Sequence, residues 1–494
     1  MKKIDIRNKR SLSCLVIVLL LTVTSCSDDY LDVDAYGKPV TENFYKTPED
    51  MDQALGAAYY PMSEQYTSYQ QVWSSDLFMG DIGTDDHLKG GLKLGDVPFL
   101  LQKQQFNLTP SNPYLEARWR IQFNGILYAN LILDKIDAVE FDDAERKKEL
   151  KAEAYFLRAY YYFYLVNFYG GVPLYDTALS FDEVNLARAT EEETYAFIEE
   201  DLKKAIQDLP SRFDKGSEYL GHADKGAALG LMMRVSLYQN KMDQVKTYGE
   251  QLFMIPYDLV DLTSIFQPEG EWNTESIFEI NYSSNTSKLG TSVPKQMMPR
   301  TPEDKGFGFS QIKEDLINAY ETGDPRLDAY YYSISDSSIY GTGWYNRKYS
   351  WAPFSNYQKP TVGGLLNSEE NVRVIRLADA YLMYAEAIYT TNPTTAIEYV
   401  NRVRTRAREN GGAGNLIPAD LPLTLTGDTL RDAIYKERRL ELAGEGLRFY
   451  DLLRTGRAST VLSGLGFQSG KNEVMPIPYS QIQLSKGVLT QNNY

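Results

Sequence analysis

The chain has 494 residues, and its 67 acidic and 51 basic side chains leave a formal net charge of −16. A surface this acidic repels phosphate backbones, so a nucleic-acid-binding protein is not expected. With only two histidines and two cysteines, a metal centre built from these ligands is not expected either.

The first 25 residues are predicted to be a secretory signal. Five basic residues precede Ser11–Val23, an apolar run of 13 residues, and a membrane-spanning helix needs ~20. Small residues then lead directly to Cys26, an arrangement that resembles a bacterial lipobox, in which the cysteine is lipidated and becomes the new N-terminus. The alternative is an ordinary secreted protein. The signal carries five basic residues and one aspartate, so the chain from Cys26 to Tyr494 has a net charge of −20.

An acidic run, Ser27-Asp28-Asp29, follows Cys26 at once. In lipoproteins of the Bacteroidetes, such a run resembles a tag for export to the cell surface; the alternative is a solvated linker. Cys14 leaves with the signal and Cys26 carries lipid. The mature chain therefore retains no cysteine for a disulfide, a nucleophile or a metal site.

Helical periodicity dominates the first part of the mature chain, about residues 26–258. Thr47-Pro48-Glu49-Asp50 combines a threonine cap, a proline at the first helical position and acids in the first turn, which predicts a helix start. Further helices are predicted at Leu115–Ile136, Arg146–Tyr169, Glu192–Leu209, Lys225–Tyr238 and Met242–Phe253.

A stretch with little periodicity, Tyr66–Phe106, interrupts this first part. It contains Trp73 and the run Asp81-Ile82-Gly83-Thr84-Asp85-Asp86. Three aspartates could hold Ca²⁺ through oxygen ligands, but their spacing is not that of an EF-hand loop. A solvated turn is the preferred interpretation, and no metal site is predicted.

The middle of the chain, about residues 259–373, is rich in Gly, Pro, Ser, Asn and Tyr and shows little helical period beyond Gln311–Tyr320. It holds three of the five tryptophans, Trp272, Trp344 and Trp351. Loops of this length are usually functional or disordered, and the aromatic content argues against disorder. The sequence therefore predicts a functional, loop-rich insertion.

The last part, about residues 374–494, returns to helical periodicity. Helices are predicted at Leu377–Ile388, Thr394–Arg408, Leu430–Ala443 and Leu447–Arg454. Helices of this size and spacing favour a mostly α fold of antiparallel pairs, packed in the manner of tetratricopeptide repeats. Composition shows no linker, so residues 26–494 are predicted to form a single domain.

The last two of these helices carry a dense set of charges. On a helix, Glu437 and Glu441 share one face, and Asp451 lies three residues from both Arg448 and Arg454. The preferred interpretation is a structural network of ion pairs. The alternative is an acid/base pair, because two carboxylates are all that a glycosidase needs. The full set is Glu437, Arg438, Arg439, Glu441, Glu445, Arg448, Asp451 and Arg454.

Several segments in a fixed order resemble the SusD-like (RagB-type) family. They are the lipobox, TPEDMDQALGAAYYPM near the start, KAEAYFLRAYYYFYLVNFYGGVPL (Lys151–Leu174), RLADAYLMYAEA (Arg376–Ala387), ERRLELAGEGLRFYDLLRTG (Glu437–Gly456) and the ending MPIPYSQIQLSKGVLTQNNY (Met475–Tyr494). The ending departs from the family pattern at Gln481 and Ser485, which affects only the packing of the tail.

The resemblance implies four tetratricopeptide-like helix pairs and a lipid anchor at Cys26 in the outer membrane, facing outward. It also implies a SusC-like TonB-dependent transporter barrel as partner and a glycan or peptide as ligand. Neither enzymatic activity nor a cofactor is expected. Two alternatives remain open: a cell-surface helical glycoside hydrolase and a tetratricopeptide-like scaffold for other proteins.

A glycan site needs aromatic rings for the apolar face of a sugar and polar groups for its hydroxyls. In the family, the ligand groove is built from an early loop and a middle insertion, which correspond to the two loop-rich stretches above. The expected ligand-binding residues are Trp73, Tyr340, Trp344, Tyr345, Asn346 and Trp351. For each of them the alternative is simple packing in the core.

Overall fold

The computed structural model describes residues 44–179, 185–301, 305–334, 340–350 and 366–494. The N-terminal part contains α2 (Pro48–Thr67), α3 (Tyr69–Val72), α4 (Asp76–Met79), β1 (His87–Gly90), α5 (Pro98–Gln104), α6 (Pro113–Lys135), α7 (Ala144–Tyr169), α8 (Glu191–Asp208), α9 (Arg212–Lys215), α10 (Lys225–Tyr238) and α11 (Met242–Leu252). The middle part contains α12 (Leu262–Ile265), β2 (Ser276–Ile280), α13 (Val293–Met297), β3 (Phe309–Ile312), α14 (Glu314–Ala319), α15 (Pro325–Tyr330), β4 (Tyr331–Ser333), β5 (Trp344–Asn346) and β6 (Val372–Arg376). The C-terminal part contains α16 (Leu377–Ile388), α17 (Pro393–Glu409), α18 (Gly427–Leu442), α19 (Arg448–Arg454), α20 (Ala458–Val461) and α21 (Tyr479–Leu484).

The long helices begin and end where local chemistry predicts. At the start of α2, the Thr47 hydroxyl accepts from the Asp50 N–H (3.1 Å), and the Asp50 carboxylate accepts from the Thr47 N–H (3.0 Å). This reciprocal capping box satisfies two N–H groups that the helix leaves without partners. Gly170 ends α7 at a φ of 73°, a conformation that favours glycine.

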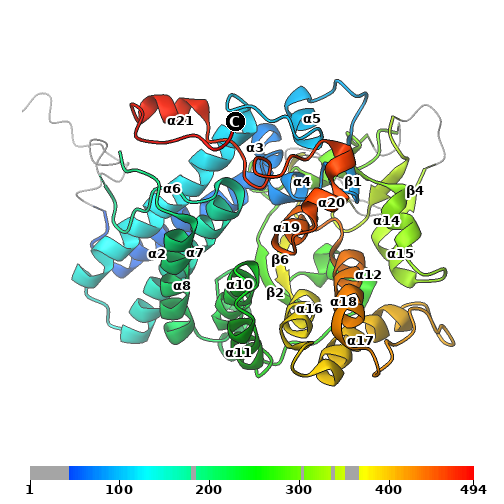
Figure 1. Cartoon of the computed structure of the whole chain (residues 1–494). Coiled ribbons are helices and arrows are strands. Elements are labelled where there is room, and N and C mark those ends of the chain that lie inside the picture. The colour runs from blue at the N-terminus through cyan, green and yellow to red at the C-terminus, as the bar shows by residue number, and fades with distance from the viewer. Residues whose placement is uncertain (1–43, 180–184, 302–304, 335–339, 351–365) are drawn as a thin grey trace, which may run out of the picture.

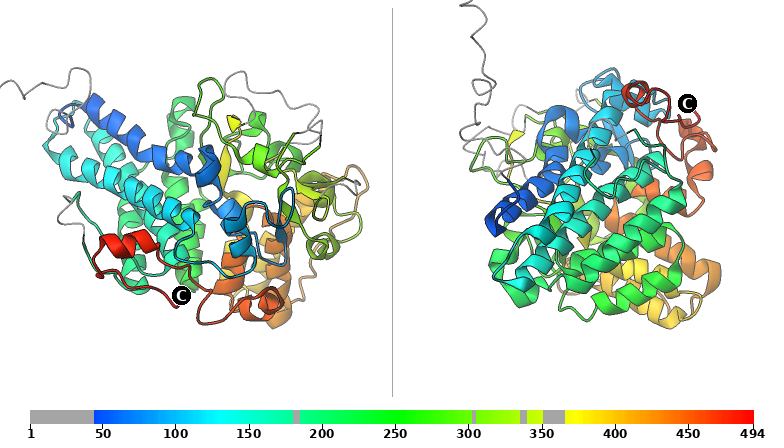
Figure 2. Two further views of the ribbon diagram at one scale, coloured as in Figure 1. Left: turned by 90° about the horizontal axis from the view of Figure 1, so that it is seen from above. Right: turned by 90° about the vertical axis from the view of Figure 1, so that its left-hand side faces the viewer.

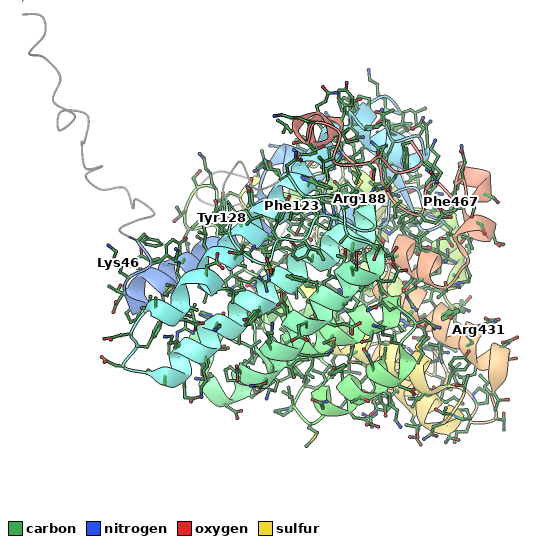
Figure 3. All side chains as sticks on the ribbon, turned by 60° about the vertical axis from the view of Figure 1, so that its left-hand side comes forward. Lys46, Phe123, Tyr128, Arg188, Arg431 and Phe467 are labelled. Atoms are coloured by element: carbon green, nitrogen blue, oxygen red, sulfur yellow. The ribbon has the colours of Figure 1, made fainter. Side chains whose placement is uncertain are left out.

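The long helices form a layer in chain order, in which each packs against its predecessor: α2, α6, α7, α8, α10, α11, α16 and α17. The ribbon colours accordingly pass from blue through green to orange across the molecule (Figures 1, 2 and 3). The predicted mostly α fold of packed helix pairs is confirmed. Within the described residues, no helix combines the length and apolar character needed to cross a bilayer.

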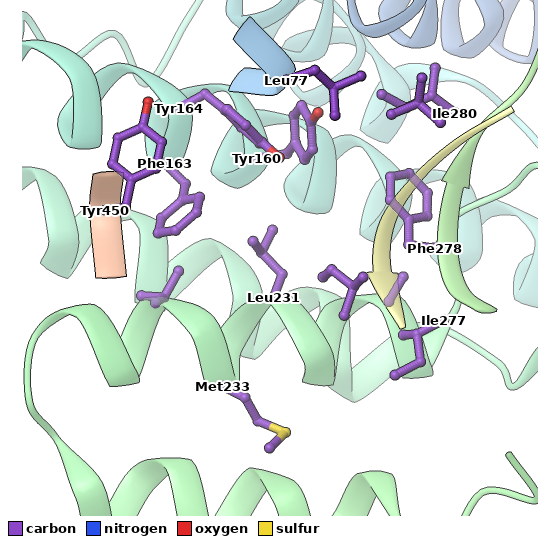
Figure 4. Packing of buried hydrophobic residues seen from close by; sticks show 14 of the residues in the cluster. Leu77, Tyr160, Phe163, Tyr164, Leu231, Met233, Ile277, Phe278, Ile280 and Tyr450 are labelled. Atoms are coloured by element: carbon purple, nitrogen blue, oxygen red, sulfur yellow. The ribbon is translucent and has the colours of Figure 1, made fainter. Parts of the chain in front are cut away.

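The core is centred on α7, because other helices cover it on several sides. In Figure 4, Tyr160 of this helix lies on the side of Phe278 of β2, and Phe163 lies beside Tyr450 of α19. Buried tyrosines need a partner for the hydroxyl group. Tyr161 donates to the Ala58 carbonyl, and Tyr169 to the Leu115 carbonyl, each at 2.6 Å.

The middle insertion leaves and rejoins the helical layer at one place. Its first strand, β2, pairs antiparallel with its last, β6, which leads directly into α16. The predicted helix at Gln311–Tyr320 is partly wrong, because residues 309–312 form β3 and only Glu314–Ala319 is helical. The partner of β3 is β1, far away in the sequence, and local periodicity carries no signal of such pairing.

The charged cluster near the C-terminus is a buried ion-pair network, as the preferred interpretation held. Glu441 of α18 is fully buried and contacts the guanidinium groups of Arg406 (2.6 Å), Arg376 (2.7 Å) and Arg326 (3.4 Å). Glu437, one turn earlier, pairs with Arg404 at 2.7 Å and with Arg326 at 2.5 Å. The two carboxylates that could have formed an acid/base pair therefore lie in the interior and are held by arginines.

The structure differs from the sequence-based expectation at Arg448 and at the aspartate run of the early loop. Arg448 pairs with Asp85 of the early loop (2.6 Å), not with Asp451, which contacts Arg454 (2.7 Å) and Arg438 (3.3 Å). The run from Asp81 to Asp86 is therefore not a solvated turn, and this prediction is wrong. Because its partners are far away in the sequence, the run resembles a free acidic loop when it is considered alone.

The remaining aspartates of this run complete the junction between the early loop and the C-terminal helices. Asp81 accepts from the Gly446 N–H at 2.9 Å, and Asp86 contacts Arg439 at 2.6 Å. In the described part of the chain, no group of three or more His, Cys, Asp or Glu side chains is arranged to hold a metal ion. The three aspartates thus fasten the early loop to the end of α18 and the start of α19.

Candidate ligand-binding site

The two loop-rich stretches meet in space. Strand β1 of the early loop pairs antiparallel with β3 of the middle insertion, with Gly90 opposite Phe309. Trp73 packs its ring edge-on against Phe309, with centroids 4.6 Å apart. Figure 1 shows β1, β4 and α14 gathered at one end of the molecule, beside the last helices. The structure thus brings together the two regions that were expected to build the site.

The approach of these loops depends on glycine. The Gly91 N–H donates to the Gly308 carbonyl at 2.8 Å. A Cβ atom at Gly90 would lie 2.2 Å from that same carbonyl oxygen, and Gly90 has a φ of 68°. Any side chain at Gly90 would both clash with this backbone and strain its own. Glycines at these positions are the sequence signal of a close backbone approach.

A buried lysine organises the loop that follows β1. The Lys89 ammonium donates to the carbonyl groups of Asp96 (2.6 Å), Gly90 (2.8 Å) and Lys93 (3.3 Å), so residues 90–96 wrap around it. Burial lowers the pKa of Lys89 to about 8, which leaves it mostly charged at neutral pH. The loop presents the apolar side chains of Leu92 and Leu94, about half exposed, to solvent.

One buried amide holds the turn before β5. The Gln311 Nε2 donates to the carbonyls of Tyr340 (2.9 Å) and Gly308 (3.0 Å), and its Oε1 accepts from the Thr342 N–H (2.8 Å). Gln311 is fully buried, whereas Tyr340 is 37% exposed and Trp344 partly exposed. Gln311 therefore fixes the backbone that carries Tyr340 and leads to Trp344.

Some of the residues with a positive φ lie in the same region, although others are spread over the described chain. Val97, Lys305 and Ser310 have φ values of 49°, 57° and 56°. A positive φ is uncommon for any residue with a side chain and is an outlier for a β-branched one such as Val97. Such conformations persist only where the surrounding structure holds them, and they cluster at functional sites.

The structure separates the expected ligand-binding residues into three groups. Tyr340 and Trp344 are accessible, as a stacking role requires. Trp73, Tyr345 and Asn346 are at most 1% exposed, so their assignment as ligand contacts is corrected. Trp351 lies outside the described residues.

The three buried residues have structural roles. Trp73 fills the space between Phe78 and Phe309. Tyr345 packs against Tyr332, and the Asn346 amide donates to the Gly444 carbonyl (3.2 Å). Sequence reasoning did not find Gln311 or Lys89, and the only local signal was the set of neighbouring glycines.

A serine–histidine pair in this region is not accessible to a substrate. The Ser310 hydroxyl lies 2.9 Å from Nδ1 of His87, but the two residues are at most 1% exposed. Burial lowers the pKa of His87 to about 3, so the imidazole is neutral at physiological pH. This pair belongs to the packing of β1 on β3.

Comparison with known proteins finds a family model that matches the first part of the chain and another that matches the last part. A family model described as "Starch-binding associating with outer membrane" matches residues 29–237, and the SusD family model matches residues 329–494. SusD-like protein P2 of Formosa agariphila is 26% identical, covering 96% of this chain and 98% of its own. A SusD-like protein of Bacteroides ovatus is 24% identical, over 88% of this chain and 80% of its own.

Solved structures share the fold. A laminarin-binding SusD-like protein superimposes with a TM-score of 0.79 at 29% identity, covering 91% of this chain and 100% of its own. Surface glycan-binding protein A from Bacteroides thetaiotaomicron, solved with laminarihexaose, gives a TM-score of 0.78 at 28% identity, with the same coverage. The two family models, the relatives aligned over nearly the whole length, the shared fold and the motifs of the sequence agree: this chain belongs to the SusD-like family.

Proposed function

We propose that this protein is a lipid-anchored receptor on the outer surface of the outer membrane. It binds a glycan and passes it to a SusC-like TonB-dependent transporter. The observation that carries the proposal is a pair of accessible rings where the two loop regions meet: the exposed Tyr340 and the partly exposed Trp344, which flank a turn held by a buried glutamine. The laminarin- and glycan-binding relatives support the glycan as ligand class.

The chemistry of the site suits a sugar. Trp344 and Tyr340 provide rings on which the apolar face of a pyranose stacks, an aromatic contact worth about 0.5–1.5 kcal/mol beyond the area that it buries. Gln311 fixes the backbone of the turn, so little conformational entropy is lost when a ligand orders it. Leu92 and Leu94 extend the accessible surface of the same end of the molecule with apolar contacts.

Isothermal titration with laminarin and laminarihexaose, beside other glycans and a peptide digest, tests the ligand class. The proposal expects heat of binding with at least one glycan and none with the digest. Binding of peptides alone would replace the glycan by a peptide as ligand. Release of reducing sugar over hours would instead favour the hydrolase, and binding of neither ligand class would favour a scaffold.

Replacing Gln311 by alanine tests the positioning of the turn. The substitution removes the bonds to the Tyr340 carbonyl and the Thr342 N–H, so the backbone between the two aromatic residues is held less firmly. We expect the affinity for a glycan ligand to fall by about tenfold, or 1.4 kcal/mol. Gln251→Ala, at an exposed position of α11, should change nothing. Equal affinities of the two variants, measured by titration, would refute the role given to Gln311.

The anchor is tested at Cys26, which lies outside the described residues, as do Asp28 and Asp29. Cys26→Ala removes the thiol that would carry lipid, so we expect the protein to leave the membrane fraction for the soluble fraction. The readout is immunoblotting of fractions from a strain that lacks the partner barrel, because the barrel could retain the protein by itself. Unchanged membrane association in that strain would contradict the lipid anchor. Asp28 and Asp29 are proposed to direct the lipoprotein to the cell surface.

A further inference from the structure

A cavity of about 540 Å³ opens between α12, α15 and the end of α17, and it contains neither Tyr340 nor Trp344. Its volume falls within the range of about 300–1,000 Å³ that is typical of ligand pockets. The wall is mixed: Leu262, Phe266 and Leu327 supply apolar surface, and Gln267, Asp328 and Arg347 are among the residues that supply polar groups.

The polar groups of this cavity are only partly used by the fold. Nη1 of Arg347 donates to the Asp328 carbonyl at 2.8 Å, but its buried Nε has no acceptor among the described residues. The side-chain amide of Gln267 and the carboxylate of Asp328 likewise bond no other residue of the described chain. The Arg347 guanidinium also lies 5.4 Å from the centroid of the Tyr332 ring, and its Nη groups, unlike the enclosed Nε, are the ones that can donate to an oxygen atom from outside the chain.

Neighbouring amides in the same wall behave differently. Asn410 accepts from the Leu262 N–H (3.1 Å) and donates to the Arg406 carbonyl (2.9 Å). Asn415 donates to the carbonyls of Arg408 (3.1 Å) and Ile417 (2.8 Å). These two side chains build the wall, and their bonding capacity is used. The side chains of Gln267 and Asp328 are accessible to solvent, and with the Arg347 guanidinium they are the polar groups of this wall that remain available to a ligand.

The charges of the cavity select the class of ligand. Lys348 is paired with Glu445 (2.7 Å), and Asp324 with Arg326 (2.8 Å). The remaining charges, one guanidinium and one carboxylate, cancel. Asp328 would repel a ligand with a phosphate or carboxylate group, and Arg347 would repel a cation. A neutral ligand with several hydroxyl groups can use the guanidinium, the carboxylate and the amide together, and its apolar face can lie on the leucine and phenylalanine side chains.

We infer that this cavity is an additional sugar-binding site, which takes a neutral segment of the glycan bound by the loop face. The ligand class rests on the proposed function; the location does not. The β4–β5 hairpin connects the two sites, because Trp344 begins β5 and Arg347 directly follows it. Two sites on one chain raise the apparent affinity for a long polymer, since binding at one site increases the effective concentration at the other.

Titration of the full mature chain with laminarihexaose tests this inference. The wild type is expected to bind about two ligands, and Asp328→Asn, Gln267→Ala and the blocking variant Thr263→Trp about one, because each removes only the cavity site. Thr263 is exposed on α12 and lines the cavity, so a large side chain there fills it without entering the core. Glu398→Gln, at an exposed position of α17, is the matched control and should resemble the wild type. Thermal melting of each variant shows that it folds.

The outcomes separate the two sites. Binding of about one ligand that Tyr340→Ala or Trp344→Ala abolishes, and that Asp328→Asn leaves unchanged, would overturn the cavity site and leave the proposed function intact. Binding that Asp328→Asn abolishes, and that the Tyr340 and Trp344 variants leave unchanged, would support the cavity and overturn the loop face. No binding of the hexasaccharide to the wild type would overturn the cavity site for this glycan, whereas the proposed function would fail only if none of the glycans titrated above bound.

Discussion

Glu441→Ala is expected to lower the free energy of unfolding by about 3–5 kcal/mol, the usual cost of removing one partner from a buried ion pair. The Glu441 carboxylate is fully buried and contacts Arg406, Arg376 and Arg326 at 2.6, 2.7 and 3.4 Å. Without it, buried guanidinium groups lose a shared acceptor. Urea unfolding followed by circular dichroism measures the change.

A matched control lies on the same helix. Asp432 of α18 is 66% exposed in its side chain and pairs with Arg431 at 2.9 Å. Asp432→Ala should cost less than about 1 kcal/mol, as exposed ion pairs do. Equal stability of the two variants would refute the structural reading of the network. Unchanged stability of Glu441→Ala with loss of ligand affinity would make the cluster a binding site instead.

The same network predicts sensitivity to acid. Burial raises the pKa of Glu441, but Arg406, Arg376 and Arg326 outweigh it and hold the pKa well below its usual range. Burial also raises the pKa of Asp451, but Arg438 and Arg454 outweigh this effect and lower the pKa to about 2. Because the folded-state pKa values are depressed, the stabilisation is present above about pH 4 and is lost as the pH falls toward 2. Glu441→Gln should flatten this part of the stability profile.

Trp73→Ala should destabilise the protein by about 3–5 kcal/mol, as the truncation of a core tryptophan does. Trp73 is fully buried and packs edge-on against Phe78 and Phe309, with centroids 4.8 and 4.6 Å apart. Since this ring joins the early loop to β3, its loss should also loosen the β1–β3 pairing. Thermal and urea unfolding measure the effect.

Trp344→Ala is the comparison for Trp73→Ala, because it removes the same side chain from a partly exposed strand. It should change stability far less than Trp73→Ala does. If both variants unfold at the same urea concentration, Trp344 belongs to the core, and its role at the surface is wrong.

Helices could be predicted from the sequence because their signals are local. The cap at Thr47, the apolar stripe of Glu192–Leu209 and the glycine that ends α7 each act within a few residues. Tertiary packing then follows chain order, so neighbouring predicted helices are also neighbours in space. The family resemblance added the order of the motifs.

The candidate site could be predicted only as a region, because its geometry depends on distant pairings. Nothing near Trp73 shows that Phe309 covers it, and nothing near Asp85 shows that Arg448 neutralises it. A tryptophan in a loop-rich stretch has the same local sequence signature whether it faces solvent or the core. Gln311 was missed for the same reason, since its bonds reach the turn at Tyr340.

The most direct test of a glycan-binding loop face is titration of Tyr340→Ala/Trp344→Ala beside the wild type, with the glycan that binds best. The double variant should lose about 1–3 kcal/mol of binding free energy at this face, the typical loss for an important interface anchor. Its melting temperature should stay near that of the wild type. An unchanged affinity and stoichiometry in a folded double variant would contradict the account, because no ligand would then rest on these rings.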